Sequence, residues 1–260
     1  MYRWEENMNV TGLEAAIVPV TGGASGIGLA ICRKLRAAGA FPILVDVNAD
    51  SLETAVAEVY AGEENPGRFG YVVDVADSKA VDAFFTKLKE DHGPATHAVA
   101  NAGIVRPVAA NEQSDENWLS VINVNLNGAF FFCRGAGRQM VEGGRGAIVN
   151  MGSIGGMFAR EGRSAYGASK AGVMQMTRTL ALEYGPSNVR VNAIAPGLIM
   201  TPIQAANAAT VSETSSRSAL KRMGTPEEIA DIAVYLLSDQ SSFVTGATVV
   251  ADGGLSIRYN

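Results

Sequence analysis

The sequence predicts an α/β fold in which a doubly wound, seven-stranded parallel sheet forms a single domain over residues 1–260. Short runs rich in Val, Ile and Ala alternate with longer helical patterns along the chain, which is typical of successive βαβ units. Apolar residues make up 47% of the chain and charged residues only 18%, so the chain can bury one large core. No linker separates two halves.

Each expected strand is a short apolar run, and the segment between two strands has helical spacing. Continuous apolar runs are typical of strands that helices cover on both faces of a sheet. The strands are expected at residues 15–20, 42–45, 69–75, 96–100, 146–151, 189–194 and 246–251, and the helices at residues 27–38, 50–60, 79–90, 117–140, 165–184 and 226–238. Pro19 departs from this pattern, because proline removes a ladder hydrogen bond from a strand.

The charge pattern argues against two classes of partner. The net charge is −5, and the Arg and Lys residues are scattered, so no basic stripe is present for a nucleic acid or an anionic membrane. Residues 1–10 are polar and acidic, unlike a signal peptide, and no run approaches the roughly 20 apolar residues of a membrane span. A small-molecule partner is therefore expected.

The cysteines and histidines suggest neither disulfides nor a metal site. Cys32 and Cys133 lie far apart and inside expected helices, which favours a reducing compartment, with cytoplasm as the expected location. His92 and His97 flank a Gly-Pro turn without a Cys or carboxylate cluster at ligand spacing, so no metal is expected.

A glycine-rich segment joins the first expected strand to the first expected helix. Gly22, Gly26 and Gly28 would let the backbone turn tightly and approach an anion at the positive end of the helix dipole. Asp46 follows about 20 residues later, where a carboxylate binds the adenosine ribose hydroxyls and repels a 2′-phosphate. The segment therefore predicts a Rossmann-like dinucleotide site that takes NAD, although Asp46 could instead cap the next turn.

A tyrosine and a lysine four residues apart complete a set of motifs. Tyr166 and Lys170 share one face of the expected helix 165–184, and Ser153 lies thirteen residues before Tyr166. From about Leu13 to Leu255, the chain resembles the short-chain dehydrogenase/reductase family. The resemblance rests on Thr21 to Gly28, Asp74 with Val75, Asn101-Ala102-Gly103, Asn125, Ser153, Tyr166 with Lys170, and Pro196-Gly197, while Pro19, Ala100 and Gly152 depart from the family pattern.

The resemblance implies a nicotinamide-dependent enzyme and a role for each matching residue. The implied catalytic residues are Asn125, Ser153, Tyr166 and Lys170. The implied cofactor-binding residues are Gly22, Ser25, Gly26, Ile27, Gly28, Asp46, Asp74, Val75, Asn101, Ala102, Gly103, Tyr166, Lys170, Pro196, Gly197, Ile199 and Thr201.

Tyr166 is the expected base that takes a proton from a secondary alcohol while NAD accepts the hydride. An ordinary phenol has a pKa of about 10, and an ammonium roughly 5 Å away, that of Lys170, is expected to lower it by about two pKa units. Ser153 would hydrogen-bond the substrate oxygen. By the resemblance, Asn125 would hold a water between Lys170 and solvent. A buried amide that only satisfies backbone groups is the alternative for Asn125, and Asn123 competes with it.

The expected substrate is a small hydroxylated molecule such as a polyol or a sugar. Residues 197–224 lack aromatic side chains and are expected to form a lid. Two alternatives are a 3-oxoacyl thioester reductase of the same fold and a non-catalytic nucleotide-sensing module. The resemblance also implies a homotetramer that pairs helices 117–140 and 165–184. Candidates for substrate contact are Arg106, Phe158, Arg160, Glu161, Gln204 and Asn207.

Overall fold

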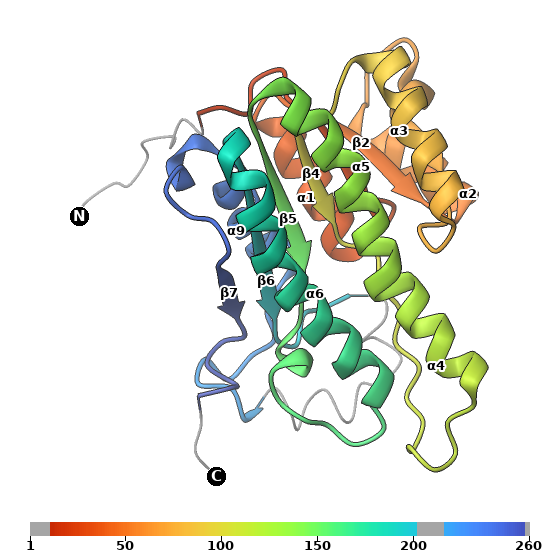
Figure 1. Ribbon diagram of the computed structural model, residues 1–260, viewed down its shortest axis with the longest axis vertical. Helices are drawn as coiled ribbons and strands as arrows, with labels where there is room; N and C mark the ends of the chain where they lie inside the picture. Colours follow the sequence, from red (N-terminus) through yellow and green to blue (C-terminus); the bar gives the residue numbers. More distant parts are fainter. Residues whose placement is uncertain (1–10, 202–215, 258–260) are drawn as a thin grey trace.

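One parallel sheet organises the molecule. The computed structural model describes residues 11–201 and 216–257, and its strands lie in the order β3-β2-β1-β4-β5-β6-β7 (Figure 1). The strands are β1 (Ile17–Thr21), β2 (Phe41–Asp46), β3 (Gly70–Val72), β4 (His97–Ala100), β5 (Gly146–Met151), β6 (Val189–Pro196) and β7 (Thr248–Ala251). The predicted doubly wound, seven-stranded parallel sheet is confirmed.

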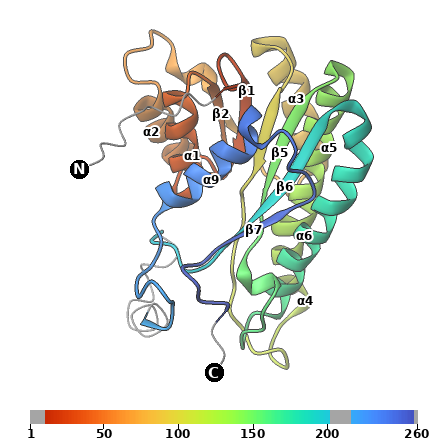
Figure 2. The ribbon, with the colours of Figure 1, turned by 90° about the vertical axis from the view of Figure 1, so that its left-hand side faces the viewer.

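Helices cover both faces of the sheet. The main helices are α1 (Gly26–Ala37), α2 (Ala49–Val59), α3 (Ser78–His92), α4 (Asp115–Ile122), α5 (Gly128–Gly143), α6 (Ser164–Tyr184) and α9 (Pro226–Leu237). Figure 2 shows α1, α2 and α9 on one face and α3, α5 and α6 on the other. The central strands are therefore buried on both sides, which explains their continuous apolar sequences.

Side-chain caps fix where several helices begin. Asp77 accepts hydrogen bonds from the backbone N–H groups of Lys79 and Ala80 at the start of α3. At the start of α9, Thr225 and Glu228 form a reciprocal capping box. Because these caps are local in sequence, the predicted helix boundaries lie close to the observed ones.

The expected helix over residues 117–140 contains a π turn that the sequence pattern did not reveal. Between α4 and α5, residues Asn123–Asn127 form a π turn. Such turns insert one extra residue into a helix and are frequent at functional sites. Here the turn contains Asn125, whose side chain is buried.

Pro19 removes a single backbone N–H donor from the sheet, on the side of β1 that faces β4. Ile17 directs both its N–H and its C=O toward Thr96, just before β4. Because backbone groups alternate in direction along a strand, Pro19 also faces β4. On the β2 side, the register runs unbroken from Ile17 opposite Phe41 to Thr21 opposite Val45.

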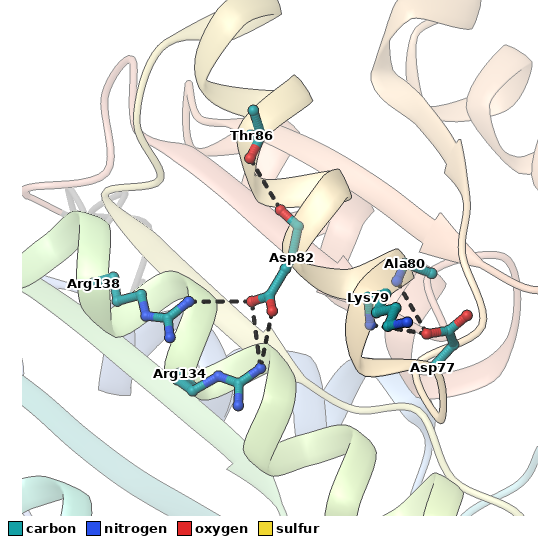
Figure 3. A network of polar contacts seen from close by, with 7 residues as sticks. All are labelled: Asp77, Lys79, Ala80, Asp82, Thr86, Arg134 and Arg138. Atoms are coloured by element: carbon teal, nitrogen blue, oxygen red, sulfur yellow. Dashed lines mark hydrogen bonds and ion pairs between the residues drawn. The ribbon is translucent and has the colours of Figure 1, made fainter.

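A polar network joins α3 to α5 at the surface (Figure 3). Arg134 Nη2 lies 3.2 and 3.3 Å from the two carboxylate oxygens of Asp82, and Arg138 Nη1 lies 3.2 Å from Asp82 Oδ1. These groups are partly exposed, so each ion pair contributes at most about 1 kcal/mol to stability. The rings of Phe85 and Phe132, which pack together beneath the network, supply the buried contact between the two helices.

The strand order places a crevice at one end of the sheet. The order reverses between β1 and β4, and open α/β sheets bind ligands at such a switch point, outside the carboxyl ends of the strands. The predicted lid includes residues 202–215, which lie outside the described residues. Within the described residues, no helix is long and apolar enough to cross a membrane.

Candidate functional site

A cavity of about 400 Å³ opens at the carboxyl ends of the strands. It extends from the loops after β2 and β3, past the glycine-rich turn after β1, to the segments that follow β4, β5 and β6. The residues that line it are Gly22, Ser25, Gly26, Ile27, Val45, Asp46, Val47, Val73, Asp74, Val75, Asn101, Ala102, Gly103, Ile104, Val105, Val124, Met151, Gly152, Ser153, Arg163, Tyr166, Lys170, Pro196, Gly197, Ile199 and Thr201. All residues predicted to be catalytic or to bind the cofactor line this cavity, except Gly28 and Asn125.

The glycine-rich turn has the shape of a phosphate cradle. Gly22 and Gly26 have φ angles of +64° and +52°, which side-chain-bearing residues rarely adopt. Ser25 is the N-cap of α1 but makes no side-chain cap bond, so the first N–H groups of α1 stay available to an anion. A Cβ added to Gly28 would lie 2.0 Å from the carbonyl oxygen of Gly22, so Gly28 lets the turn pack onto its own helix.

A hydrogen-bond network fixes the floor of the cradle. Thr21 Oγ1 accepts from the backbone N–H groups of Asn101 and Ala102 at 2.9 and 3.0 Å. The Asn101 side-chain amide donates to the carbonyls of Thr21 and Gly22. The turn after β1 and the segment after β4 are therefore held together across the switch point.

Two carboxylates line the part of the cavity that lies farthest from Tyr166 along the sheet. Asp46 ends β2 and accepts hydrogen bonds from the backbone N–H groups of Ala24 and Asn48 at 3.2 and 3.1 Å. Asp74 follows β3 and accepts from the N–H of Ala76 at 2.9 Å. The bond to Ala24 ties the Asp46 carboxylate to the glycine-rich turn, so this carboxylate lies close to any dinucleotide that the turn binds.

Ser153, Tyr166 and Lys170 meet at the other part of the cavity. Ser153 follows β5, and its hydroxyl accepts from the N–H of Gly155 at 3.0 Å. Tyr166 and Lys170 share one face of α6, with Lys170 Nζ 5.9 Å from the centre of the phenol ring. The Lys170 ammonium is buried and donates to the carbonyl of Met151 at 2.7 Å.

The pKa values of this group differ from the expectation. Burial raises the pKa of the Tyr166 phenol, and its hydrogen bond with Ser153 and the charge of Arg163 only partly oppose this rise. The expected lowering by Lys170 is therefore wrong for the protein's own groups. The Lys170 ammonium bonds to a backbone carbonyl, and burial lowers its pKa to about 8. A positively charged nicotinamide ring would be a further source of stabilisation for the phenolate.

Asn125 lies behind the cavity rather than in its wall. Its amide oxygen accepts from the N–H of Ile104, and its amide nitrogen donates to the Ile104 carbonyl and to the Ser169 hydroxyl. The side chain thus satisfies backbone groups, as the alternative interpretation expected. Asn123 bonds to Asn127 instead, so the structure favours Asn125 over Asn123 as the residue beside the site.

The end of the sheet also anchors the start of the predicted lid. Gly197 packs against Asp252, since a Cβ at Gly197 would lie 2.6 Å from the Asp252 Cβ. The backbone of Leu198 and Met200 pairs with Gly224, at the far end of the predicted lid. The two ends of the segment therefore meet beside the cavity wall that Ile199 and Thr201 form.

The residues predicted to contact the substrate do not lie in the described cavity wall. Arg106, Phe158, Arg160 and Glu161 are exposed, and none lines the cavity. Gln204 and Asn207 lie outside the described residues. Arg163 does line the cavity and was missed, although its position in the sequence, three residues before Tyr166, was an available signal.

Comparison with known proteins finds relatives that match almost the whole chain. Residues 22–256 match a family model described as enoyl-(acyl carrier protein) reductase. The 3-oxoacyl-[acyl-carrier-protein] reductase of Thermotoga maritima is 39% identical, over 94% of this chain and 99% of that protein. Galactitol 2-dehydrogenase of Rhizobium johnstonii is 39% identical, over 91% of this chain and 93% of that protein. The crystal structure of a short-chain type dehydrogenase/reductase from Mycobacterium marinum superposes with a TM-score of 0.90 at 29% identity, over 96% of this chain and 99% of that one.

Proposed function

Because this chain belongs to the short-chain dehydrogenase/reductase family of oxidoreductases, which use a nicotinamide cofactor, we propose that it is an NAD-dependent dehydrogenase of a secondary alcohol. The substrate would be a polyol, a sugar or a related hydroxylated molecule, and the product its ketone. The observation that carries the proposal is the meeting of Ser153, Tyr166 and Lys170 in one cavity with the glycine-rich turn.

Each polar group has a distinct task in the proposed reaction. The cavity residues would hold a nicotinamide cofactor, which would supply the acceptor for the hydride of the carbinol carbon. Tyr166, as phenolate, takes the hydroxyl proton, and Ser153 donates a hydrogen bond to the substrate oxygen as its charge develops. Lys170 is held by the Met151 carbonyl, from where its ammonium can bind the cofactor ribose. Asn125 positions the backbone at Ile104.

The charge near the glycine-rich turn favours NAD over NADP. The Asp46 carboxylate would accept hydrogen bonds from the adenosine ribose hydroxyls and would repel a 2′-phosphate. Ser25 and Val47, which line the cavity near Asp46, provide no cation that could bind such a phosphate.

Asp46→Asn is expected to lower the ratio of kcat/KM with NAD to kcat/KM with NADP at least tenfold. The substitution removes the repelling charge and keeps an oxygen for one of the two backbone N–H groups, those of Ala24 and Asn48, which bond to different oxygens of Asp46. Initial rates with each cofactor measure the ratio. Asp50→Asn, an exposed change in the first turn of α2, is the control. An unchanged ratio in Asp46→Asn would show that this carboxylate does not select the cofactor.

A 3-oxoacyl thioester reductase is the second candidate. The Thermotoga maritima relative carries that name at the same identity as the galactitol dehydrogenase relative. Asp46 disfavours this function only if the reductase uses NADPH. A non-catalytic nucleotide sensor is the third candidate, and the complete Ser153, Tyr166 and Lys170 set argues against it.

Absorbance at 340 nm tests these candidates directly. Wild-type protein would be assayed with NAD or NADP against polyols, sugars, hydroxy acids and simple secondary alcohols, and with NADH or NADPH against an acetoacetyl thioester. We expect turnover of a secondary alcohol with NAD. Turnover of the thioester alone, with strong NADPH preference, would establish the reductase. NADH binding without any turnover would favour the sensor.

We further propose a homotetramer in the cytoplasm. Apolar side chains on the outer surfaces of α4 and α5 are 38–52% exposed, namely Trp118, Leu119, Phe130 and Val141, and such a patch favours burial against a second copy. Both cysteines are buried and form no disulfide, as suits a reducing compartment. Sedimentation velocity at micromolar concentration is expected to give a tetramer, and a stable monomer would contradict the assembly.

A further inference from the structure

Arg163 occupies a distinctive position in the cavity. It is the residue just before α6, three residues ahead of Tyr166, and its half-buried side chain lines the cavity together with Ser153 and Tyr166. Its charge reaches the Tyr166 phenol, whose pKa it lowers. Arg163 therefore lies within electrostatic range of the atoms where the proposed reaction takes place.

The guanidinium of Arg163 has no counter-charge within the described part of the chain. Other arginines form ion pairs, such as Arg33 with Glu58 and Arg222 with Glu228. Burial and the positive charge of Arg160 lower the Arg163 pKa, and the Tyr166 phenol opposes this only in part. A cation in this condition gains stability from any anion that enters the cavity.

Charges in the cavity are segregated by sign. The two carboxylates among the described lining residues, Asp46 and Asp74, follow β2 and β3. The two cations are Arg163, which immediately precedes α6, and Lys170, which lies in its second turn, and both line the cavity with Ser153, which follows β5. Since β1 and β4 lie between β2 and β5 in the sheet, the substrate part of the cavity is positive.

We infer that Arg163 binds a carboxylate of the substrate, so that the substrate class is a hydroxy acid rather than a neutral polyol. The inference rests on the proposed dehydrogenase function for the identity of the reacting hydroxyl. A single guanidinium matches a monovalent carboxylate with two parallel N–H···O bonds. Lys170 is already bonded to Met151, so a divalent phosphate would find one available cation instead of several.

A purely electrostatic role for Arg163 on Tyr166 makes a different prediction. Loss of the charge would then raise the Tyr166 pKa, and oxidation of every substrate would shift to higher pH by the same amount. Loss of a carboxylate contact would act mainly through KM and only on substrates that carry the carboxylate. Paired substrates that differ in this group separate the two roles.

The first experiment measures binding without turnover. Isothermal titration calorimetry of the protein with NADH would compare butanoate with butanamide, which has a similar shape and no charge. Wild-type protein is expected to bind butanoate at least tenfold more tightly. Arg163→Gln is expected to lose this preference, and Arg160→Gln, which removes an exposed charge three residues away, to keep it. Equal binding of the two probes by wild-type protein would overturn the inference.

The second experiment measures turnover of D-gluconate against D-glucitol, which carries a hydroxymethyl group in place of the carboxylate. Arg163→Gln is expected to lower the gluconate-to-glucitol ratio of kcat/KM about 10- to 100-fold, the range for a hydrogen bond to a charged group. Arg163→Lys keeps the charge without the paired geometry and is expected to recover part of the ratio. Thermal unfolding of each variant shows whether it is folded.

The outcomes separate this inference from the proposed function. Turnover of glucitol with no carboxylate preference overturns the role of Arg163 and leaves the dehydrogenase in place. Butanoate preference that depends on Arg163, without turnover of any alcohol, supports the anion site while the dehydrogenase fails. Preference for D-glucitol 6-phosphate over gluconate would overturn the carboxylate assignment in favour of a phosphate. An equal loss of kcat/KM for gluconate and glucitol in Arg163→Gln would overturn the carboxylate contact and assign the purely electrostatic role.

Discussion

Gly28→Ala is expected to weaken dinucleotide binding strongly and to lower the free energy of unfolding by about 2–3 kcal/mol. The added Cβ would lie 2.0 Å from the Gly22 carbonyl oxygen and 2.7 Å from the Asn101 amide nitrogen. Gly22 cannot simply rotate away, because its backbone already has a positive φ and its carbonyl accepts from Asn101. The clash must therefore open the turn that forms the phosphate cradle.

Fluorescence titration with NADH and urea unfolding measure the two effects separately. The dissociation constant for NADH is expected to rise at least 100-fold. Gly143→Ala is the matched control, since a Cβ there meets nothing within 4 Å and Gly143 ends α5 without a positive φ. That control should leave NADH binding unchanged and alter stability by less than about 1 kcal/mol. NADH binding by Gly28→Ala within threefold of wild type would refute the role of this close contact.

The strand and helix pattern was predictable because it depends on short-range physics. Apolar runs set the strands, local caps such as Asp77 set helix starts, and a right-handed βαβ connection leaves few ways to arrange them. The π turn at Asn123–Asn127 was not predictable, because the apolar spacing of α4 and α5 is compatible with one continuous helix. Its conformation depends on the tertiary bonds between Asn125 and Ile104, which are distant in sequence.

The cofactor part of the site was predictable for a similar reason. Gly22 and Asp46 lie at strand ends, and parallel strands place all such ends at one edge of a sheet. The roles given to these residues, the single-domain organisation and the lid remain predictions.

The substrate part was harder to predict. Phe158 and Arg160 lie in the irregular segment between β5 and α6, where sequence spacing does not determine side-chain direction. Arg163 lies where that segment enters α6, and its helical spacing from Tyr166 was the available signal. The Tyr166 pKa was misjudged because the sequence gives no measure of burial, which here outweighs the nearby charges.

Tyr166→Phe is expected to lower kcat for alcohol oxidation about 10³-fold while leaving the NADH dissociation constant within threefold of wild type. General-base catalysis contributes about 10²- to 10⁴-fold in enzymes, and phenylalanine keeps the ring while removing the proton acceptor. Tyr184→Phe is the matched control, because Tyr184 ends the same helix but its hydroxyl packs near Gly137 instead of lining the cavity. The control should retain wild-type kcat.

The pH profile tests whether Tyr166 acts as the base or only shapes the cavity. The phenol must be deprotonated to take the alcohol proton, so kcat/KM for oxidation should fall as the pH drops through the Tyr166 pKa. Ketone reduction needs the protonated phenol and should instead weaken as the pH rises through that pKa. Since burial raises this pKa, oxidation should be favoured by alkaline conditions. Tyr184→Phe should keep the pH dependence of both oxidation and reduction. The residual oxidation by Tyr166→Phe should no longer fall as the pH drops through this range. If oxidation by Tyr166→Phe kept the same fall at low pH, the proton acceptor would be a different group, because phenylalanine cannot titrate.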